Sequence, residues 1–432
     1  MKTYINPGRN TWTDILKRPL FDVSELYGRV QNILTEIREQ GDEKLREYTE
    51  RFDGVKLDNF EVSPEEITRA EASIDQDLKD AIALAAENIK AFHSAQMPEI
   101  RKMETAPGVI CWQKPVAIEK VGLYIPGGTA PLFSTVLMLA LPAKIAGCKQ
   151  IVLCSPPDKN GNIHPAILYA AKVAGVTQIY KLGGVQAIGA MAYGTETVPK
   201  TYKIFGPGNQ YVTAAKQLVS MNEVSIDMPA GPSEVLVVAD ETSNPAFVAS
   251  DLLSQAEHGA DSQVVLVTNN ENTLKEVVAE VEAQVAQLPR KELAEKALSH
   301  SVLIVVSDDT ERVDLINEYA PEHLIISTKK YMELAEKITN AGSVFLGEFT
   351  PESAGDYASG TNHTLPTNGW ARSYSGVNLD SFLKKITFQE ISEEGLLTIG
   401  PAIEKMAATE QLEAHKNAVT LRLKQIEKNG TK

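Results

Sequence analysis

The stretch Val121-Gly-Leu-Tyr-Ile-Pro-Gly-Gly128 is a short apolar strand that ends in a glycine turn, and a helical stretch, Pro131–Ala146, follows it. From here on the chain alternates short apolar strands with helices. Further strands are expected at Gln150–Cys154, Gln178–Leu182 and Tyr202–Phe205, and further helices at Pro165–Ala174, Gln186–Tyr193 and Gln210–Met221. This alternation predicts a parallel, doubly wound sheet with right-handed crossovers.

A second alternating set begins at Glu234. Its expected strands are Val235–Ala239, Gln263–Thr268, Ser301–Val306, His323–Ser327 and Ser343–Leu346, with helices that include Asn244–Glu257 and Leu274–Val285. No sequence repeat links the two sets strongly enough to indicate duplication. The fold class predicted from the sequence is therefore α/β, with two doubly wound lobes.

The flanking regions have a different pattern. Apolar residues at helical spacing begin at Asp22 and recur from Glu65 to about Phe92, the segment Gln96–Ala117 is irregular, and the chain from Leu379 onward is helical and charged. We expect four parts: an N-terminal arm, a first α/β lobe, a second α/β lobe and a C-terminal helical arm. Their boundaries are residues 1–21, 22–120 with 233–378, 121–232, and 379–432.

The composition is that of a globular protein. The chain has 432 residues, enough for more than one domain, and its net charge of −15 argues against nucleic-acid and anionic membrane partners. No apolar window approaches the length of a membrane-spanning helix, and the first residues lack the apolar stretch of a signal peptide. Three cysteines cannot form a disulfide framework, so we expect a reducing cytoplasm.

The run Ala320-Pro-Glu-His-Leu324 carries the most informative pair of side chains. Glu322 and His323 are neighbouring proton acceptors of different basicity. Two basicities suit a reaction with two proton-abstraction steps.

Candidate metal ligands occur in two other segments. Gln255 and His258 are three apart at the end of an expected helix capped by Gly259, so both would project from one face. A histidine beside an amide oxygen can bind a divalent metal, but a histidine that suits the helix dipole explains the pattern as well. The glycine-rich loop Ala354–His363 offers Asp356 and His363, and an ordinary turn is the alternative.

Three glycine turns link strands to helices, at 122–128, 206–209 and 227–233. Such turns can present backbone amides to a phosphate, although none is a complete dinucleotide fingerprint and a tight turn explains each one. Cys148 is a conceivable nucleophile toward an aldehyde, but Cys148 and Cys154 lie in apolar surroundings typical of buried cysteines. Glu410 and His415 are five apart, so one regular helix would not point them the same way.

Together these runs resemble the histidinol dehydrogenase family. The resemblance rests on six motifs in order, along essentially the whole chain: Val121–Gly128, Phe205-Gly-Pro-Gly-Asn209, Asp227-Met-Pro-Ala-Gly-Pro-Ser-Glu234, Gln255-Ala-Glu-His258, Ala320–Leu324 and Gly355-Asp-Tyr. It implies incomplete Rossmann-like lobes similar to those of aldehyde dehydrogenases. It also implies an enzyme that oxidises L-histidinol to L-histidine through an aldehyde, with zinc and two NAD⁺, as the last step of histidine biosynthesis.

The resemblance further implies a role for each matching residue. Glu322 and His323 match the catalytic proton acceptors. The metal ligands are matched by Gln255, His258, Asp356 and His415. The substrate contacts are matched by Ser233, His363 and Glu410, together with His323 and the four ligands. The NAD contacts are matched by Tyr124, Gln186 and Asn209.

The resemblance also implies a homodimer with one zinc ion per subunit and shared active sites, in which His415 comes from the partner's C-terminal arm. The first lobe would then hold the metal and catalytic residues and the second lobe the cofactor. Two other functions stay open on the residues alone: a metal-dependent hydrolase in which Glu322 activates water, and a metal-dependent binding protein.

Overall fold

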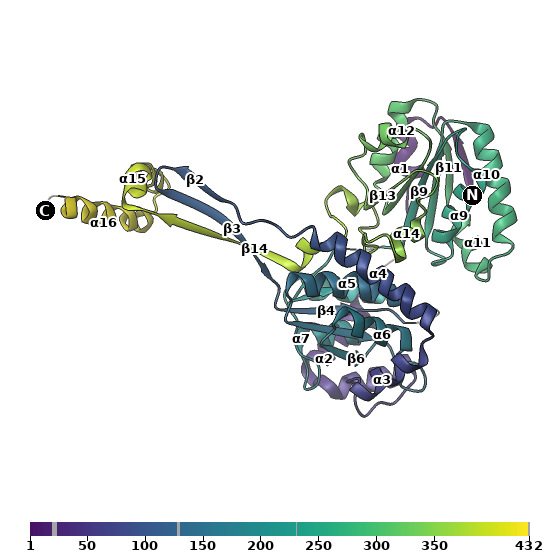
Figure 1. The fold of residues 1–432 in the computed structure, drawn as a ribbon, viewed down its shortest axis with the longest axis horizontal. Helices are drawn as coiled ribbons and strands as arrows, with labels where there is room; N and C mark the ends of the chain where they lie inside the picture. The colour runs from purple at the N-terminus through teal and green to yellow at the C-terminus, as the bar shows by residue number, and fades with distance from the viewer. Residues whose placement is uncertain (20–23, 128–129, 230, 431–432) are drawn as a thin grey trace. The chain divides into compact units, whose positions relative to one another are not determined.

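The computed structural model describes residues 1–19, 24–127, 130–229 and 231–430 (Figure 1). Two compact units divide the chain: Met1–Gln96 with Ile118–Phe382, and Met97–Ala117 with Leu383–Lys432. The expected helix start at Asp22, Gly128 of the first glycine turn and Ala230 of the third lie outside the described residues.

A six-stranded parallel sheet forms one lobe of the first unit. The strand order is β1-β11-β10-β9-β12-β13. The strands are β1 (Lys2–Ile5), β9 (Glu234–Ala239), β10 (Gln263–Thr268), β11 (Val302–Val305), β12 (His323–Ser327) and β13 (Ser343–Leu346). The helices that accompany them are α1 (Trp12–Ile15), α9 (Pro245–Ala256), α10 (Glu271–Val285), α11 (Lys291–Ser299), α12 (Asp309–Tyr319), α13 (Tyr331–Ala335) and α14 (Glu352–Tyr357).

Side-chain alternation explains why this sheet is covered on both faces. In β9, Val235 and Val237 join a cluster with α9, α10 and α11, whereas Leu236 and Val238 join another with α1 and α12. All six residues of β9 are buried, as expected for a strand inside a parallel sheet. We call this part the six-stranded lobe.

The other lobe contains a five-stranded parallel sheet with the order β6-β5-β4-β7-β8. The strands are β4 (Lys120–Tyr124), β5 (Gln150–Ser155), β6 (Gln178–Lys181), β7 (Lys203–Phe205) and β8 (Ser225–Ile226). The helices between them are α5 (Phe133–Ala146), α6 (Pro165–Ala174), α7 (Gly184–Tyr193) and α8 (Gln210–Ser220). Since the chain moves from β4 to β5 and β6 on one side and later to β7 and β8 on the other, β4 marks the switch in strand order.

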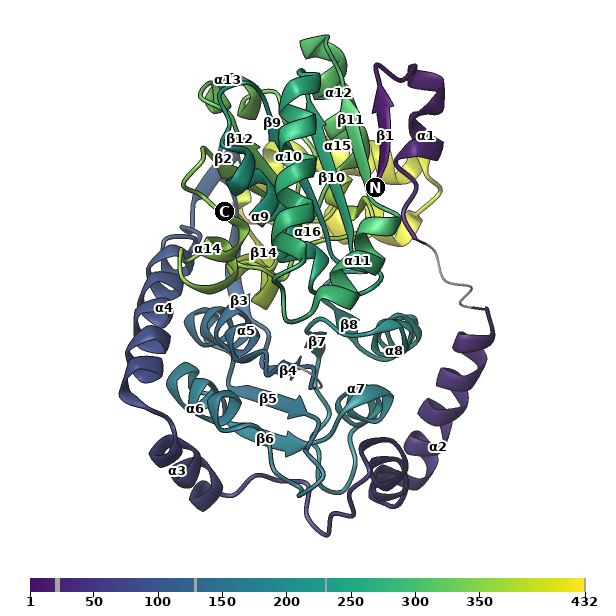
Figure 2. The ribbon, with the colours of Figure 1, turned by 90° about the vertical axis from the view of Figure 1, so that its right-hand side faces the viewer.

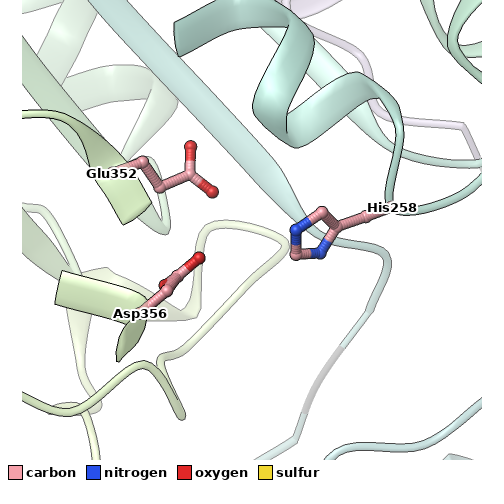
Figure 3. A group of neighbouring side chains, drawn as sticks. All are labelled: His258, Glu352 and Asp356. Atoms are coloured by element: carbon pink, nitrogen blue, oxygen red, sulfur yellow. The ribbon is translucent and has the colours of Figure 1, made fainter. Parts of the chain in front are cut away.

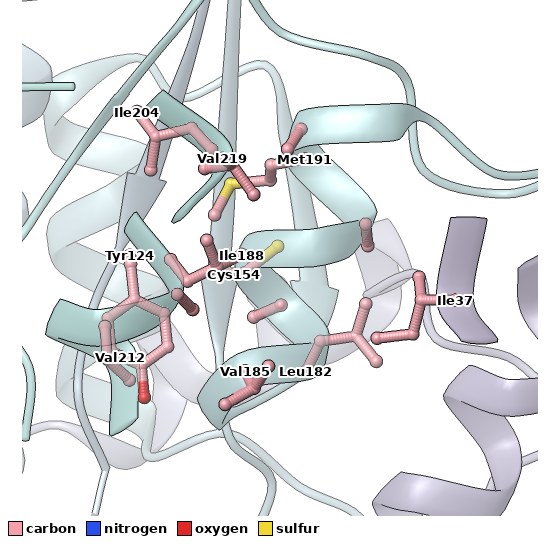
Figure 4. Close-up of a cluster of buried hydrophobic side chains, with 14 of the residues drawn as sticks. Ile37, Tyr124, Cys154, Leu182, Val185, Ile188, Met191, Ile204, Val212 and Val219 are labelled. Atoms are coloured by element: carbon pink, nitrogen blue, oxygen red, sulfur yellow. The ribbon is translucent and has the colours of Figure 1, made fainter. Parts of the chain in front are cut away.

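Three N-terminal helices complete this five-stranded lobe (Figure 2). They are α2 (Ser24–Tyr48), α3 (Pro64–Ser73) and α4 (Gln76–Ser94). Helix α2 packs against α7 and α8, α3 against α6, and α4 against α5. The core between them is apolar: Ile37 of α2 belongs to the same buried cluster as Val185 and Ile188 of α7 (Figure 4). The expected division assigned residues 22–120 to the other lobe, whereas these helices bury their apolar faces on this one.

The second unit is a three-stranded antiparallel sheet with two helices. The strands β14 (Leu383–Ile391), β3 (Val109–Ala117) and β2 (Lys102–Ala106) form it in that order, and α15 (Glu393–Thr409) packs against α16 (Glu413–Gly430). The sequence suggested an irregular segment at 96–117 and a wholly helical arm after Leu379, and both expectations are wrong. The β14 side chains are mostly exposed, so the strands lack the apolar run that identifies a buried strand.

Most elements of the alternating regions follow the sequence pattern. The strands β10, β12 and β13 begin and end where the apolar runs do, and the predicted α/β fold with parallel sheets is confirmed. The single helical stretch expected from Glu65 to Phe92 is two helices, because Asp75 caps the start of α4. Among the described residues, no helix is long and apolar enough to cross a membrane.

Candidate active site

Glu322 and His323 lie at the amino-terminal edge of the six-stranded sheet. His323 is the first residue of β12 and is in register with Val235 of β9 and Ser343 of β13. Helix α12 ends at Tyr319, and the left-handed backbone of the next residue, Ala320, turns the chain toward this strand. The Glu322 carboxylate accepts a hydrogen bond of 2.9 Å from the backbone N–H of Glu234, which fixes the carboxylate beside the sheet.

His323 is surrounded by carboxyl groups. Its Nδ1 lies 3.7 Å from an oxygen of Glu322 and 3.8 Å from one of Glu352, and its Nε2 lies 3.7 Å from Oδ1 of Asp356. The Nδ1 atom is also 3.3 Å from the backbone oxygen of Glu234. The imidazole therefore has carboxyl groups near both ring nitrogens, at ion-pair rather than hydrogen-bond distance.

Helix α14 brings two acids to this edge. Glu352 and Asp356 are four residues apart, so they lie on one face of the short helix. These two carboxylates form a group with His258: one oxygen of each carboxylate and one ring nitrogen of His258 all lie within 4.8 Å of one another (Figure 3). The structure thus brings together two predicted ligands and adds Glu352. Asp356 lies on a helix rather than in the loop that the sequence suggested.

Helix α9 explains how Gln255 and His258 reach the same edge. Because β9 and β10 are parallel, the connecting helix runs back from the carboxyl edge and ends at the amino edge. The helix ends at Ala256, three residues before the expected glycine cap, and does not end in a left-handed glycine. Gln255 is fully buried on α9, which packs against α14, whereas His258 lies beyond the helix end and is exposed.

The electrostatics of the cluster favour a cation. Burial raises the pKa of Glu322 to about 7 and that of Glu352 to about 8. Burial would lower the pKa of His323, but Glu352, Glu322 and Asp356 outweigh it and raise the value to about 10. Such an excess of buried acid is stabilised by positive charge. Both amide atoms of Gln255 and both carboxylate oxygens of Glu352 lack hydrogen-bond partners in the described part of the chain. This donor set fits a divalent metal ion.

His363 contacts a residue of the cluster, and Ser233 lies at the same sheet edge. The Nδ1 atom of His363 is 3.0 Å from the backbone oxygen of Asp356, and its Nε2 is 3.1 Å from the hydroxyl of Thr135 in the first turn of α5. This residue therefore connects the two lobes of the first unit. Ser233 directly precedes β9 and is half-buried at the same edge as Glu322.

A cavity of about 1470 Å³ opens at the carboxyl ends of β4 and β5. Tyr124, Gln186 and Asn209, the three residues matched to NAD contacts, all line it. The Tyr124 hydroxyl accepts a hydrogen bond of 3.1 Å from the N–H of Gly184, and Gln186 donates one of 3.0 Å to Asp53. The sequence analysis did not single out Asp53.

The turn after β7 packs closely against the backbone at the end of β4. Gly206 has φ +126°, and a side chain there would overlap the backbone oxygen of Tyr124. Its N–H donates to Asp227, which also pairs with Lys216. Asn209 caps α8 by accepting from the N–H groups of Tyr211 and Val212, so a helix-capping role is present at this position.

The cysteines are not placed for nucleophilic chemistry. Cys148 and Cys154 are buried, and burial raises the pKa of Cys148 to about 12 and that of Cys154 further. A thiol that stays protonated is a poor nucleophile. The interpretation of both as buried apolar residues therefore agrees with the structure.

Glu410 and His415 belong to the second unit, and both are exposed. Helix α15 ends at Thr409, Gln411 adopts a left-handed backbone, and α16 begins at Glu413. A helix boundary thus separates the two residues, which explains their five-residue spacing.

Two residues of these sites belong to none of the motifs found in the sequence. Glu352 is four residues before Asp356 and follows Pro351, a spacing and a helix start that together could have identified it. Asp53 follows Phe52 in a short π-helical turn and comes to the cavity from a distant part of the chain. No local pattern marks Asp53, because only the packing of α2 on α7 brings it near Gln186.

Comparisons with known proteins agree with this geometry. The histidinol dehydrogenase family model matches residues 16–423. A histidinol dehydrogenase from Bacteroides fragilis is 65% identical over 99% of this chain and 100% of its own, and one from Escherichia coli K12 is 53% identical over 96% of each chain. The crystal structure of histidinol dehydrogenase from Elizabethkingia anophelis is 56% identical, covers 99% of both chains and superposes with a TM-score of 0.97. On these similarities, together with the site geometry, the chain belongs to the histidinol dehydrogenase family of oxidoreductases.

Proposed function

We propose that this protein oxidises L-histidinol to L-histidine through L-histidinaldehyde, with zinc and two NAD⁺, as the last step of histidine biosynthesis. The observation that carries the proposal is the meeting of His258, Glu352 and Asp356 next to the Glu322–His323 pair at one sheet edge. A group that fits a metal ion and a pair of proton acceptors are both needed for this chemistry.

Gln255, His258 and Asp356 would hold the metal ion from the side of the six-stranded lobe. Their donors are nitrogen and oxygen without a thiolate, a set that suits a site with open coordination positions better than a closed structural one. When bound, a divalent cation supplies an anchor for the imidazole and amine of histidinol and compensates the carboxylate charge that holds His323 protonated.

The cofactor proposal rests on the cavity of the five-stranded lobe. Its volume exceeds the roughly 1,000 Å³ of the largest common small-molecule pockets, which leaves room for a dinucleotide. It lies where the strand order switches, the usual ligand position in an open α/β sheet. Thr135, which contacts His363 of the cluster, is four residues from Pro131 of the cavity wall, so cofactor and substrate would meet between the two. When bound, NAD⁺ supplies the hydride acceptor for each of the two oxidations.

In the proposed first oxidation, neutral His323 accepts the hydroxyl proton of histidinol as the carbinol hydrogen leaves as hydride. Its Nε2 is the available atom, since it lacks a hydrogen-bond partner among the described residues and lies on the Asp356 side. Ser233, which precedes β9 at this edge, and His363, which contacts the backbone of Asp356, would contact the substrate.

In the proposed second oxidation, Glu322 takes a proton from water, which adds to the aldehyde carbon. A carboxyl with a pKa raised to about 7 by burial is suited to this base role near neutral pH. Once it has released the first proton to solvent, His323 accepts a hydroxyl proton of the hydrated aldehyde as the carbon-bound hydrogen leaves as the second hydride of the reaction.

The proposal includes a homodimer in which His415 and Glu410 of the partner subunit complete each site. Exposed apolar side chains in the second unit support a partner: Met103, Phe388, Ile391, Leu397, Met406, Leu412 and Leu421. Exposed apolar patches of this kind are typical of protein interfaces. We further propose that the dimer works in the cytoplasm on small molecules, without nucleic-acid or membrane partners.

A direct test is absorbance at the reduced-nicotinamide band after mixing the protein, NAD⁺ and histidinol. The proposal predicts a steady increase that a chelator abolishes. A hydrolase or a binding protein produces no such signal, so a flat trace with folded, metal-loaded protein refutes the proposed oxidation.

A further inference from the structure

Glu352 is assigned no step in the proposed oxidation, yet its side chain is among the least solvated acids of the described residues. The residue is 1% exposed, and both carboxylate oxygens lack a hydrogen-bond partner among the described residues. The imidazole of His323 lies close to it, with Nδ1 3.8 Å away, and a ring nitrogen of His258 lies within 4.8 Å. An ionisable group buried in this way is costly unless it is paired or bound to a metal.

The direction of the side chain indicates what would compensate this cost. From the first turn of α14 the carboxylate points toward Asp356 and His258 (Figure 3), and its oxygen lies within 4.8 Å of their ligand atoms. Ligands of one ion at about 2.0–2.2 Å must lie within twice that distance of one another, so small side-chain movements suffice for all three to share it.

We propose that Glu352 is a direct ligand of the divalent cation when histidinol is absent. This inference rests on the proposed function. Histidinol would fill two coordination positions of the ion with its own nitrogen donors. When histidinol is absent, water or a protein side chain must take those coordination positions. Glu352 is the carboxylate placed to take one of them and to leave it when substrate binds.

The test compares Zn²⁺ affinity in metal-depleted wild type, Glu352→Gln and Glu348→Gln, measured against a chelating indicator without substrate. Glutamine keeps the size of the side chain, and Glu348 is an exposed acid four residues earlier that serves as the matched control. We expect Glu352→Gln to bind Zn²⁺ at least about tenfold more weakly and Glu348→Gln to match wild type. Metal-depleted Glu352→Gln should melt no lower than wild type, because it removes one of the three acids crowded around His323 while no ion compensates them.

A second measurement separates a ligand from a neighbouring charge. Cobalt-loaded wild type and Glu352→Asp are compared by visible absorption, since the bands of Co²⁺ depend on its ligands and geometry. A ligand role predicts shifted bands and weaker binding, because aspartate keeps the charge but withdraws the oxygen by one methylene. The inference is overturned if Glu352→Gln binds Zn²⁺ with wild-type affinity and Glu352→Asp shows wild-type cobalt bands. A wild type that binds no divalent ion refutes the proposed metal site itself.

Discussion

The two lobes of the first unit are built alike but carry their polar groups at opposite sheet edges. In the five-stranded lobe the cavity opens at the carboxyl ends of β4 and β5, where parallel sheets usually bind ligands. In the six-stranded lobe the charged cluster sits at the amino ends of β9, β12 and β13. The helix that connects two parallel strands runs back across the sheet. The end of α9 therefore lies at the amino edge, where it places Gln255 and His258.

This difference separates two kinds of recognition. The cavity is large and bordered by turns and helix starts, as suits an extended cofactor. The cluster is compact and rich in buried acid, as suits an ion and a proton relay. Changes at the amino edge should therefore alter chemistry and metal content, whereas changes at the carboxyl edge should alter cofactor affinity.

The largest effect is expected from His323→Asn at the amino edge. Loss of the proton acceptor should lower turnover by about two to four orders of magnitude in the nicotinamide assay. His300→Asn is the matched control, since His300 belongs to the same lobe and contacts the backbone of Ser262 instead of the cluster. Turnover close to wild type in His323→Asn would remove this edge from the chemistry.

Glu322→Gln tests whether the two proton acceptors at the amino edge, Glu322 and His323, have different roles. In the proposed mechanism, aldehyde oxidation needs water activated by Glu322 and alcohol oxidation does not, so the rate of aldehyde oxidation should fall by about two orders of magnitude more. Separate rates with histidinol and histidinaldehyde as substrates measure this. Equal loss of both half-reactions would contradict the assigned split of roles.

Gln186→Ala addresses the carboxyl edge. Removal of one hydrogen-bonding side chain from the cavity wall should raise KM for NAD⁺ about two- to tenfold, with metal content unchanged. Steady-state kinetics and metal analysis on the same sample give both quantities. Loss of metal without a change in KM would reverse the assignment of the two edges.

Asp53→Asn tests the electrostatics of the cavity. Burial raises the pKa of Asp53 from 3.8 to about 6. Between these two pH values the carboxyl group is therefore ionised in the unfolded chain but still mostly protonated in the folded protein. The contribution of Asp53 to the free energy of unfolding therefore decreases as pH rises between these two values. The variant should be more stable than wild type by about 1 kcal/mol at pH 8 and equal to it near pH 4, measured by urea unfolding. A larger stability gain of Asp53→Asn at pH 4 than at pH 8 would contradict this pH dependence.

The smallest effect is expected from Cys148→Ala. The buried thiol has a pKa raised to about 12 and lies outside both sites, so turnover and aldehyde oxidation should match wild type. Loss of aldehyde oxidation alone would instead identify Cys148 as a covalent nucleophile.

Much of the fold follows from local apolar patterns, and the exceptions share a cause. Strands such as β10 and β12 are continuous apolar runs because both sheet faces are covered. The strands β2 and β14 were missed because their side chains are mostly exposed and polar, which removes the apolar signal. The packing of α2 to α4 on the five-stranded lobe was also missed, since an amphipathic helix does not specify its partner.

The candidate site divides in the same way. His258, Asp356 and His323 are assigned by motif, and the structure brings them to one sheet edge. Glu352 belongs to none of the six motifs, and its spacing to Asp356 is a weak signal until its burial and missing hydrogen bonds are known. Residues such as Asp53 depend on contacts between distant segments, which one sequence does not encode locally.

The central claim is that the amino-edge cluster binds a divalent ion that the oxidation of an amino alcohol requires. The most direct measurement is a Zn²⁺ titration of metal-depleted protein in the presence of histidinol and NAD⁺, with NADH and histidine both quantified. The account predicts that activity rises until one ion is bound per chain and that two NADH form for each histidine. Full activity in the metal-depleted protein, or NADH formation that does not respond to added ion, would contradict it.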